Sequence, residues 1–219
     1  MSISGCVLLL FLLFHLSMNV VAVFSADAYN TICALLGANW YAVAATVALI
    51  GIIGIHFLYA LILTLANRKA RGDDRYAVNT RPKGVSWASK NMFAIGLVVF
   101  GFMGLHLAQF WYKMMFAELL GHHTVTMHDG SVIGTQDGAA FIRYYFSHLW
   151  VVIAYLVWYV ALWFHLTHGI WSAINTVGWN NQVWFNRLKT ISYILATAIF
   201  GGFAFVTLFF YAKSLCGGC

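Results

Sequence analysis

The sequence predicts an all-α integral membrane protein, a bundle of five transmembrane helices, and three observations support this prediction. Hydrophobic residues make up 62% of the 219 residues and charged residues only 8%, whereas globular proteins are roughly half apolar and a quarter charged. Five apolar runs are each long enough to cross about 30 Å of hydrocarbon as helices. None of these runs alternates as a strand of a membrane barrel would. We therefore expect one transmembrane domain over residues 1–219.

The expected spans cover about 5–24, 41–66, 92–111, 147–172 and 191–211. Only the first has a competing interpretation, because a short apolar stretch near the start of a chain is also typical of a signal peptide. A signal peptide normally begins with basic residues, and Met1 to Gly5 has none. We therefore expect a true span, which begins so abruptly that a basic lead-in is expected before it.

The charges predict an orientation with the N-terminus inside and the C-terminus outside. Seven of the 12 lysines and arginines lie between Arg68 and Lys90, and cationic loops stay in the cytoplasm. A topology signal therefore explains the net charge of +6 without a nucleic-acid partner. The chain ends in a tail, 216–219, whose Cys216 and Cys219 form a single Cys-x-x-Cys pair. One such pair is weak support for a redox or metal site.

Histidines within the spans are the candidate functional residues, because ionisable side chains in a bilayer need a partner or a cavity. His56 and His165 lie roughly 22 and 27 Å below the outer ends of inward-running helices, in the inner half of the membrane. His106 lies roughly 22 Å from the inner end of an outward-running helix, and His15 stands late in its own outward span. Four helices thus supply two pairs of imidazoles, each at one depth.

Two same-depth pairs are what two stacked haems need for axial ligands from facing helices. A zinc site would want three or four ligands at one level, and no carboxylate lies in any span. Glycines three residues apart precede two of the histidines and would make room for a flat ring, although small residues also serve plain helix packing. They are Gly51, Gly54, Gly101 and Gly104.

His168 lies one turn beyond His165 on the same helix, so one iron will not use both residues. His165 is closer in depth to His56 and is the expected ligand. His168 is the alternative ligand, or a partner for a haem propionate.

Several segments resemble the membrane cytochrome b subunit of succinate:quinone oxidoreductases and fumarate reductases, in its Bacteroides-type, single-chain, five-helix, dihaem form. They are FHLSMN at 14–19, NRKARG at 67–72, RYAV at 75–78, SWASKNM at 86–92, FWYKMM at 110–115 and WFHLTHG at 163–169. The resemblance covers nearly the whole chain. It implies that His56 and His165 ligate the haem b proximal to the soluble subunits, and that His15 and His106 ligate the distal haem b.

The resemblance further implies a respiratory complex of the bacterial inner membrane. Its partners would be a flavoprotein carrying FAD, where succinate and fumarate interconvert in the tricarboxylic acid cycle, and a subunit with iron–sulfur clusters. This chain would anchor them and pass electrons to or from a quinone, menaquinone in this branch. Some dihaem relatives carry a glutamate two residues before the fourth-span ligand, but here that residue is Trp163, so their proton route is not implied.

Three other functions remain open from the residues alone. One is a cytochrome b subunit of another quinone-linked enzyme, a formate dehydrogenase or a hydrogenase. Another is a haem-free, proton-coupled transporter with titrating histidines, although broken helices and internal repeats, the usual signs of one, are not evident. The third is a structural anchor whose histidines only bond to neighbouring helices. Asn30, Asn39, Trp40 and Gln109 are candidates for a quinone site near the outer face.

Overall fold

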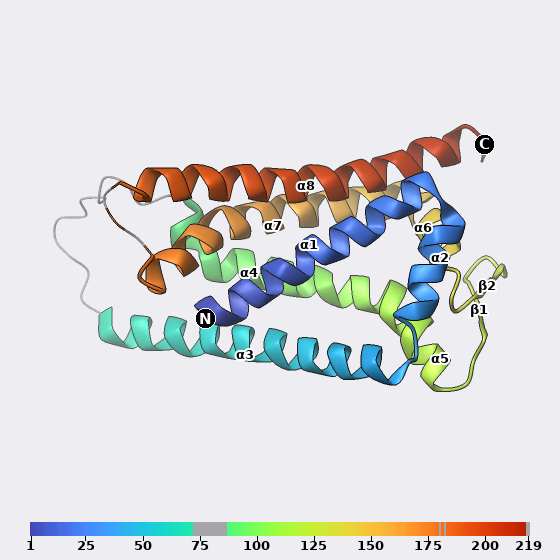
Figure 1. The fold of residues 1–219 in the computed structure, drawn as a ribbon, viewed down its shortest axis with the longest axis horizontal. Helices are drawn as coiled ribbons and strands as arrows, with labels where there is room; N and C mark the ends of the chain where they lie inside the picture. Colours follow the sequence, from blue (N-terminus) through green and yellow to red (C-terminus); the bar gives the residue numbers. More distant parts are fainter. Residues whose placement is uncertain (72–86, 180, 182, 218–219) are drawn as a thin grey trace.

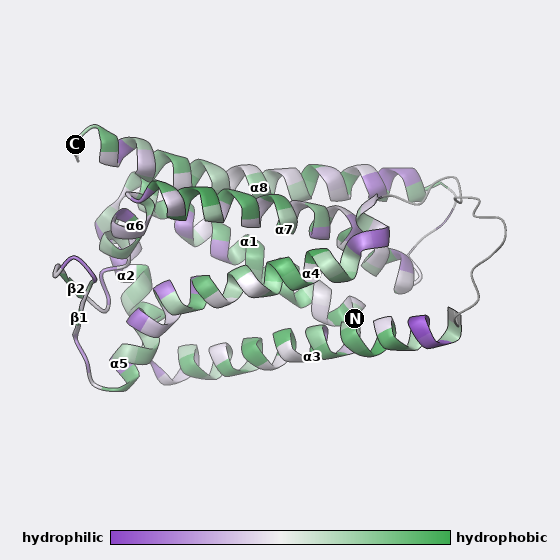
Figure 2. Ribbon diagram, turned by 180° about the vertical axis from the view of Figure 1, so that it is seen from behind, coloured by the Kyte–Doolittle hydropathy of each residue, from purple (hydrophilic) through white to green (hydrophobic). Residues whose placement is uncertain are grey.

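The computed structural model is an all-helical bundle and describes residues 1–71, 87–179, 181 and 183–217. Within these residues, five segments are long and apolar enough to cross a membrane, which agrees with the predicted fold class. Figure 2 shows that the long helices are predominantly hydrophobic along their lengths. The segments are α1 (Ser2–Phe24), α3 (Trp40–Arg71), α4 (Trp87–His106) with its continuation to Leu119, α7 (Leu149–Thr176) and α8 (Phe185–Leu215).

Helices α7 and α8 form the centre of the bundle. Val151 and Val152 of α7 and Ala196 and Ile199 of α8 are almost completely buried. Helix α4 packs against α7, and α1 crosses the bundle obliquely, contacting α3, α7 and α8 (Figure 1). Helix α3 lies at the edge, and no residue of its most apolar stretch is buried. The two central helices therefore fix the positions against which the outer helices dock.

The fourth span begins slightly later than predicted. The expected start was 147, but α7 begins at Leu149 after His148, whose backbone is extended (φ −95°, ψ 114°). A short helix, α6 (Gly138–Phe146), ends immediately before this point. The chain therefore turns at 147–148, between two helices and within the first two residues of the predicted span.

The predicted loop 112–146 is largely structured. Helix α4 continues as a π-helix, η1 (Leu107–Phe116), and one turn of α-helix, α5 (Ala117–Leu119). Strands β1 (Thr124–Thr126) and β2 (Val132–Gly134) then form an antiparallel hairpin with Val125 opposite Ile133. In its turn Asp129 accepts hydrogen bonds from the Ser131 hydroxyl and backbone N–H, which hold the pKa of this carboxyl below its usual value.

A second short helix, α2 (Ala26–Leu35), joins α1 to α3 at the same end of the bundle (Figure 1). Its first turn is capped by the Ser25 side chain, which accepts a hydrogen bond from the Ala28 N–H. Helix α2 packs against α6, and in this contact burial raises the pKa of the Cys33 thiol to about 11. The thiol is therefore neutral at physiological pH.

Part of the sequence prediction lies outside the described residues. This applies to 72–86, which include Asp73, Asp74, Arg75, Arg81 and Lys83 of the cationic loop, and to Cys219 of the terminal pair.

Asn30 connects α2 to α6 through two hydrogen bonds. Its amide donates to Asp137 Oδ1 at 2.8 Å and accepts from the Ala139 N–H at 2.9 Å. Asn30→Ala removes both bonds and leaves the buried Ala139 N–H without this acceptor, while Asp137 Oδ1 still accepts from the Ala140 N–H. We therefore expect the free energy of unfolding to fall by about 1–3 kcal/mol. Thermal unfolding in detergent micelles measures the loss. Thr31→Ala is the control, because the exposed Thr31 hydroxyl bonds only within its own helix, to Asp27 O; equal loss in both variants would contradict the assignment.

Candidate functional site: two histidine pairs

His15 of α1 and His106 at the end of α4 lie side by side. Their ring centroids are 5.8 Å apart and the ring planes are at 83°. Aromatic rings surround the pair: Phe11 stacks on His15 at 5.5 Å, and Trp158 lies 5.6 Å from His106. The pair therefore joins two helices that are far apart in the sequence, inside an apolar aromatic shell.

His56 of α3 and His165 of α7 form the second pair. Their ring centroids are 6.3 Å apart and the planes are at 65°. The two rings lie against glycines on neighbouring helices: a Cβ at Gly5 would be 3.5 Å from His56 Cε1, and one at Gly96 would be 3.7 Å from His165 Cε1, both ordinary van der Waals contacts. The structure thus brings together the same two pairs that the depth estimate grouped.

The spacing within each pair fits two axial ligands of one metal. Two imidazoles bound to one metal through bonds of about 2 Å have ring centroids roughly 6 Å apart. The observed separations of 5.8 and 6.3 Å lie on either side of this value. Among the described residues, no group of three or more His, Cys, Asp or Glu side chains lies close enough to hold a metal ion. The imidazoles occur as pairs, which is the donor set of a six-coordinate haem.

Hydrogen bonds determine which ring nitrogen is free in one histidine of each pair. His56 Nδ1 lies 3.0 Å from Ser4 Oγ, and that hydroxyl donates its only hydrogen to Met1 O at 2.8 Å. With that hydrogen on Met1 O, the Ser4 oxygen accepts from His56, so Nδ1 carries the imidazole hydrogen and Nε2 keeps its lone pair. His106 makes the same kind of contact through Nδ1, at 3.3 Å from the Tyr155 hydroxyl. Metal-bound histidines are usually fixed in this way, by a bond from the other ring nitrogen.

The remaining buried ring nitrogens have no such partner. Within the described part of the chain, His165 Nδ1 and His168 Nδ1 are buried without a hydrogen-bond partner. A buried polar atom in this condition carries a desolvation cost and can still form a hydrogen bond to a ligand. His168 lies against Trp171, with ring centroids 5.3 Å apart. Both histidines of α7 thus retain unused bonding capacity at the inner pair.

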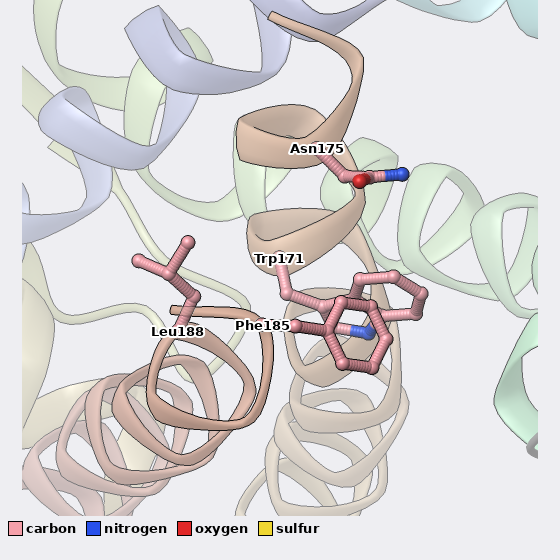
Figure 3. Close-up of a pocket in the computed structure, with 4 residues that line it drawn as sticks. All are labelled: Trp171, Asn175, Phe185 and Leu188. Atoms are coloured by element: carbon pink, nitrogen blue, oxygen red, sulfur yellow. The ribbon is translucent and has the colours of Figure 1, made fainter. Parts of the chain in front are cut away.

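A shallow pocket lies just beyond His168, where α7 ends and α8 begins. It is lined by Trp171, Asn175, Phe185 and Leu188 (Figure 3). The Trp171 ring contacts both His168 and Phe185, at 5.3 and 5.7 Å between centroids. An aromatic contact therefore connects the inner histidine site with this pocket.

The glycines predicted to make room for a flat ring do border open space. A Cβ at Gly51, Gly54, Gly101 or Gly104 would meet no other atom within 4 Å. Gly201 on α8 is equally open, so open space is not confined to the histidine pairs. Gly51, Gly101 and Gly104 are exposed, so this open space does not by itself mark a haem site, and the ring spacings are the observation that fits one.

The candidates for a quinone site have mostly internal roles. Asn30 links α2 to α6, as described above, and the Asn39 amide donates to Ala34 O and Leu35 O. Gln109 is buried and accepts from Tyr155, whereas Trp40 is 82% exposed. The sequence prediction missed Trp111, whose indole N–H is buried without a partner among the described residues. It also missed Tyr155 and Ser4, the two hydroxyl partners of the histidines.

No family model, no curated protein and no solved structure matches this chain.

Proposed function

We propose that this chain is the membrane anchor and electron-transfer subunit of a succinate dehydrogenase or fumarate reductase complex, passing electrons between an iron–sulfur subunit and a quinone. The observation that carries the proposal is the pair of interhelical imidazole contacts, His15 with His106 and His56 with His165, at the spacing of axial ligands. Haem b, when bound, supplies one-electron iron chemistry.

The residues have distinct roles in this proposal. His15 and His106 would hold the distal haem and His56 and His165 the proximal haem, while His168 would bond a propionate or serve as the alternative ligand. With two imidazoles bound, a haem iron would have no open position for oxygen, and electron transfer is the chemistry it would supply. The aromatic shell around His15 and His106 keeps water from the outer site.

The two pairs lie on different helices and at different levels of the bundle, which supports a stacked pair of electron carriers. The orientation rests on the cationic segment after α3, which would lie in the cytoplasm and face the flavoprotein and iron–sulfur subunits. The chain would then lie in the bacterial inner membrane, and its quinone would be menaquinone. The choice of succinate and fumarate as the reaction of the partner subunits is supported by the sequence segments that resemble that family.

The test is a haem count on the complex purified from its native membrane. Reduced-minus-oxidised spectra and a pyridine haemochrome assay, normalised to protein, should give two low-spin b haems per chain. Copurification of a flavoprotein with succinate–quinone activity would support the succinate assignment, whereas a formate dehydrogenase or hydrogenase would replace it. If a complex purified under conditions that retain its cofactors contains no haem, the proposal is overturned, and a transporter or a purely structural anchor is favoured.

A further inference from the structure

A buried chain of hydrogen bonds leads away from His106. His106 Nδ1 lies 3.3 Å from the hydroxyl of Tyr155 on α7, and this hydroxyl donates to Gln109 Oε1 at 2.8 Å. Tyr155 is 2% exposed and Gln109 6% exposed. Neither side chain was singled out by the histidine pattern, and both are buried. We name these three residues the outer relay.

The outer relay has a defined direction. A tyrosine hydroxyl has one hydrogen, and that of Tyr155 is donated to the Gln109 carbonyl oxygen. The Tyr155 oxygen can therefore only accept at His106, so His106 carries its hydrogen on Nδ1 and presents the lone pair of Nε2. In a buried, low-dielectric site each bond of such a chain polarises the next. The imidazole consequently donates more electron density through Nε2 than an unbonded ring would.

The position of Gln109 depends on the π-helix. Gln109 follows His106 by three residues and lies in η1, whose backbone starts at Leu107. π-helical turns change the register of the side chains that follow, and they are frequent at functional sites. Here the altered turn begins immediately after the histidine and places a buried amide against Tyr155.

We propose that Tyr155 and Gln109 are positioning residues that fix the Nδ1–H tautomer of His106 and lower the reduction potential of the haem held by His15 and His106. The inference rests on the proposed function. A more basic axial imidazole stabilises ferric over ferrous iron, and second-shell bonds of this kind tune both affinity and potential. The inner pair has a separate partner, because His56 bonds Ser4 near the start of the chain. The outer relay therefore acts on one haem only.

The experiment compares Tyr155→Phe with Tyr159→Phe in the complete complex. Tyr159 is a matched control: it lies one turn further along α7, is buried, and bonds Thr207 Oγ1 at 3.0 Å with no contact to a histidine nitrogen. Redox titration followed in the haem absorbance bands, together with the electron paramagnetic resonance of the ferric haems, resolves the two centres. We expect Tyr155→Phe to raise the potential of one haem, change its ferric signal and weaken its binding about 10-fold. Tyr159→Phe should leave both potentials unchanged.

Gln109→Glu tests the same inference if the complex with Tyr155→Phe does not assemble. Gln109→Glu preserves the size of the side chain and gives Tyr155 a stronger acceptor, so the same haem should shift to a lower potential. Two assembled variants with wild-type potentials and ferric signals would overturn the inference and leave the proposed function intact. A wild-type complex without haem would instead overturn the proposed function itself.

Discussion

Replacing His56 with alanine removes one of the two proposed b haems and leaves the other in place. His56 and His165 belong to α3 and α7, whereas His15 and His106 belong to α1 and α4, so each pair rests on its own two helices. Loss of an axial imidazole removes an iron–nitrogen bond from one site only. We expect the pyridine haemochrome count per chain to fall by half, and quinone-linked turnover of the complex to fall by an order of magnitude or more.

The control for this variant is His122→Ala. His122 is exposed in the segment before β1 and lies outside the long apolar helices, so both haems and full turnover should remain. His165→Ala should reproduce the spectrum of His56→Ala, while His168→Ala should keep both haems, because only His165 shares a ring contact with His56. Retention of both haems by His56→Ala would refute the pairing.

The five long helices and the histidine pairs were accessible from the sequence for physical reasons. A continuous apolar run of sufficient length has few alternatives to a spanning helix in a bilayer. Such helices run roughly along one axis, so counting residues at about 1.5 Å each gives the depth of a side chain. Residues at equal depth on different helices can meet, as His56 and His165 do. Depth does not give the rotation of a helix about its own axis.

The unknown rotation of each helix about its axis explains which site residues could not be predicted from the sequence. The contact of Tyr155 with His106 and Gln109 depends on the register of α7 against α4 and on the π-helical turn of η1. The bond from Ser4 to His56 depends on the oblique course of α1 (Figure 1). Helix α2, the hairpin and α6 were missed because they are short, and their hydropathy pattern is weaker than that of a span. Gln109 follows His106 by three residues, a spacing that puts both on one helix face, but this spacing alone does not identify Gln109 as part of the histidine site.

Helices α1 and α8 are in close contact beside His15, at Leu16 and Gly202. A Cβ at Gly202 would lie 2.8 and 2.9 Å from the two terminal carbons of Leu16 and 3.3 Å from its Cγ. Leu16 adjoins His15, and the His15 ring lies 5.9 Å from the ring of Phe203, the residue after Gly202. The two helices therefore pack tightly beside the outer pair, and a glycine makes this contact possible.

Gly202→Val places a branched side chain into this contact and should push α1 away from α8. Overpacking of this kind costs about 1–3 kcal/mol, and the displacement moves His15 away from His106. We expect the haem of the outer pair to be lost or substoichiometric, the haem of the inner pair to be retained, and the temperature of unfolding in detergent to fall. Haem content and the ferric resonance of each centre measure this selectivity.

Gly201→Val is the matched control, because Gly201 is exposed on the same helix and a Cβ there would meet no atom within 4 Å. The two variants add the same side chain to adjacent residues of α8, so helix propensity and lipid contact change almost equally. A difference between them reports the contact with Leu16 alone. Equal haem content in both variants would show that the spacing of α1 and α8 does not position His15, and the outer pair would then depend on α4 and α7 for its geometry.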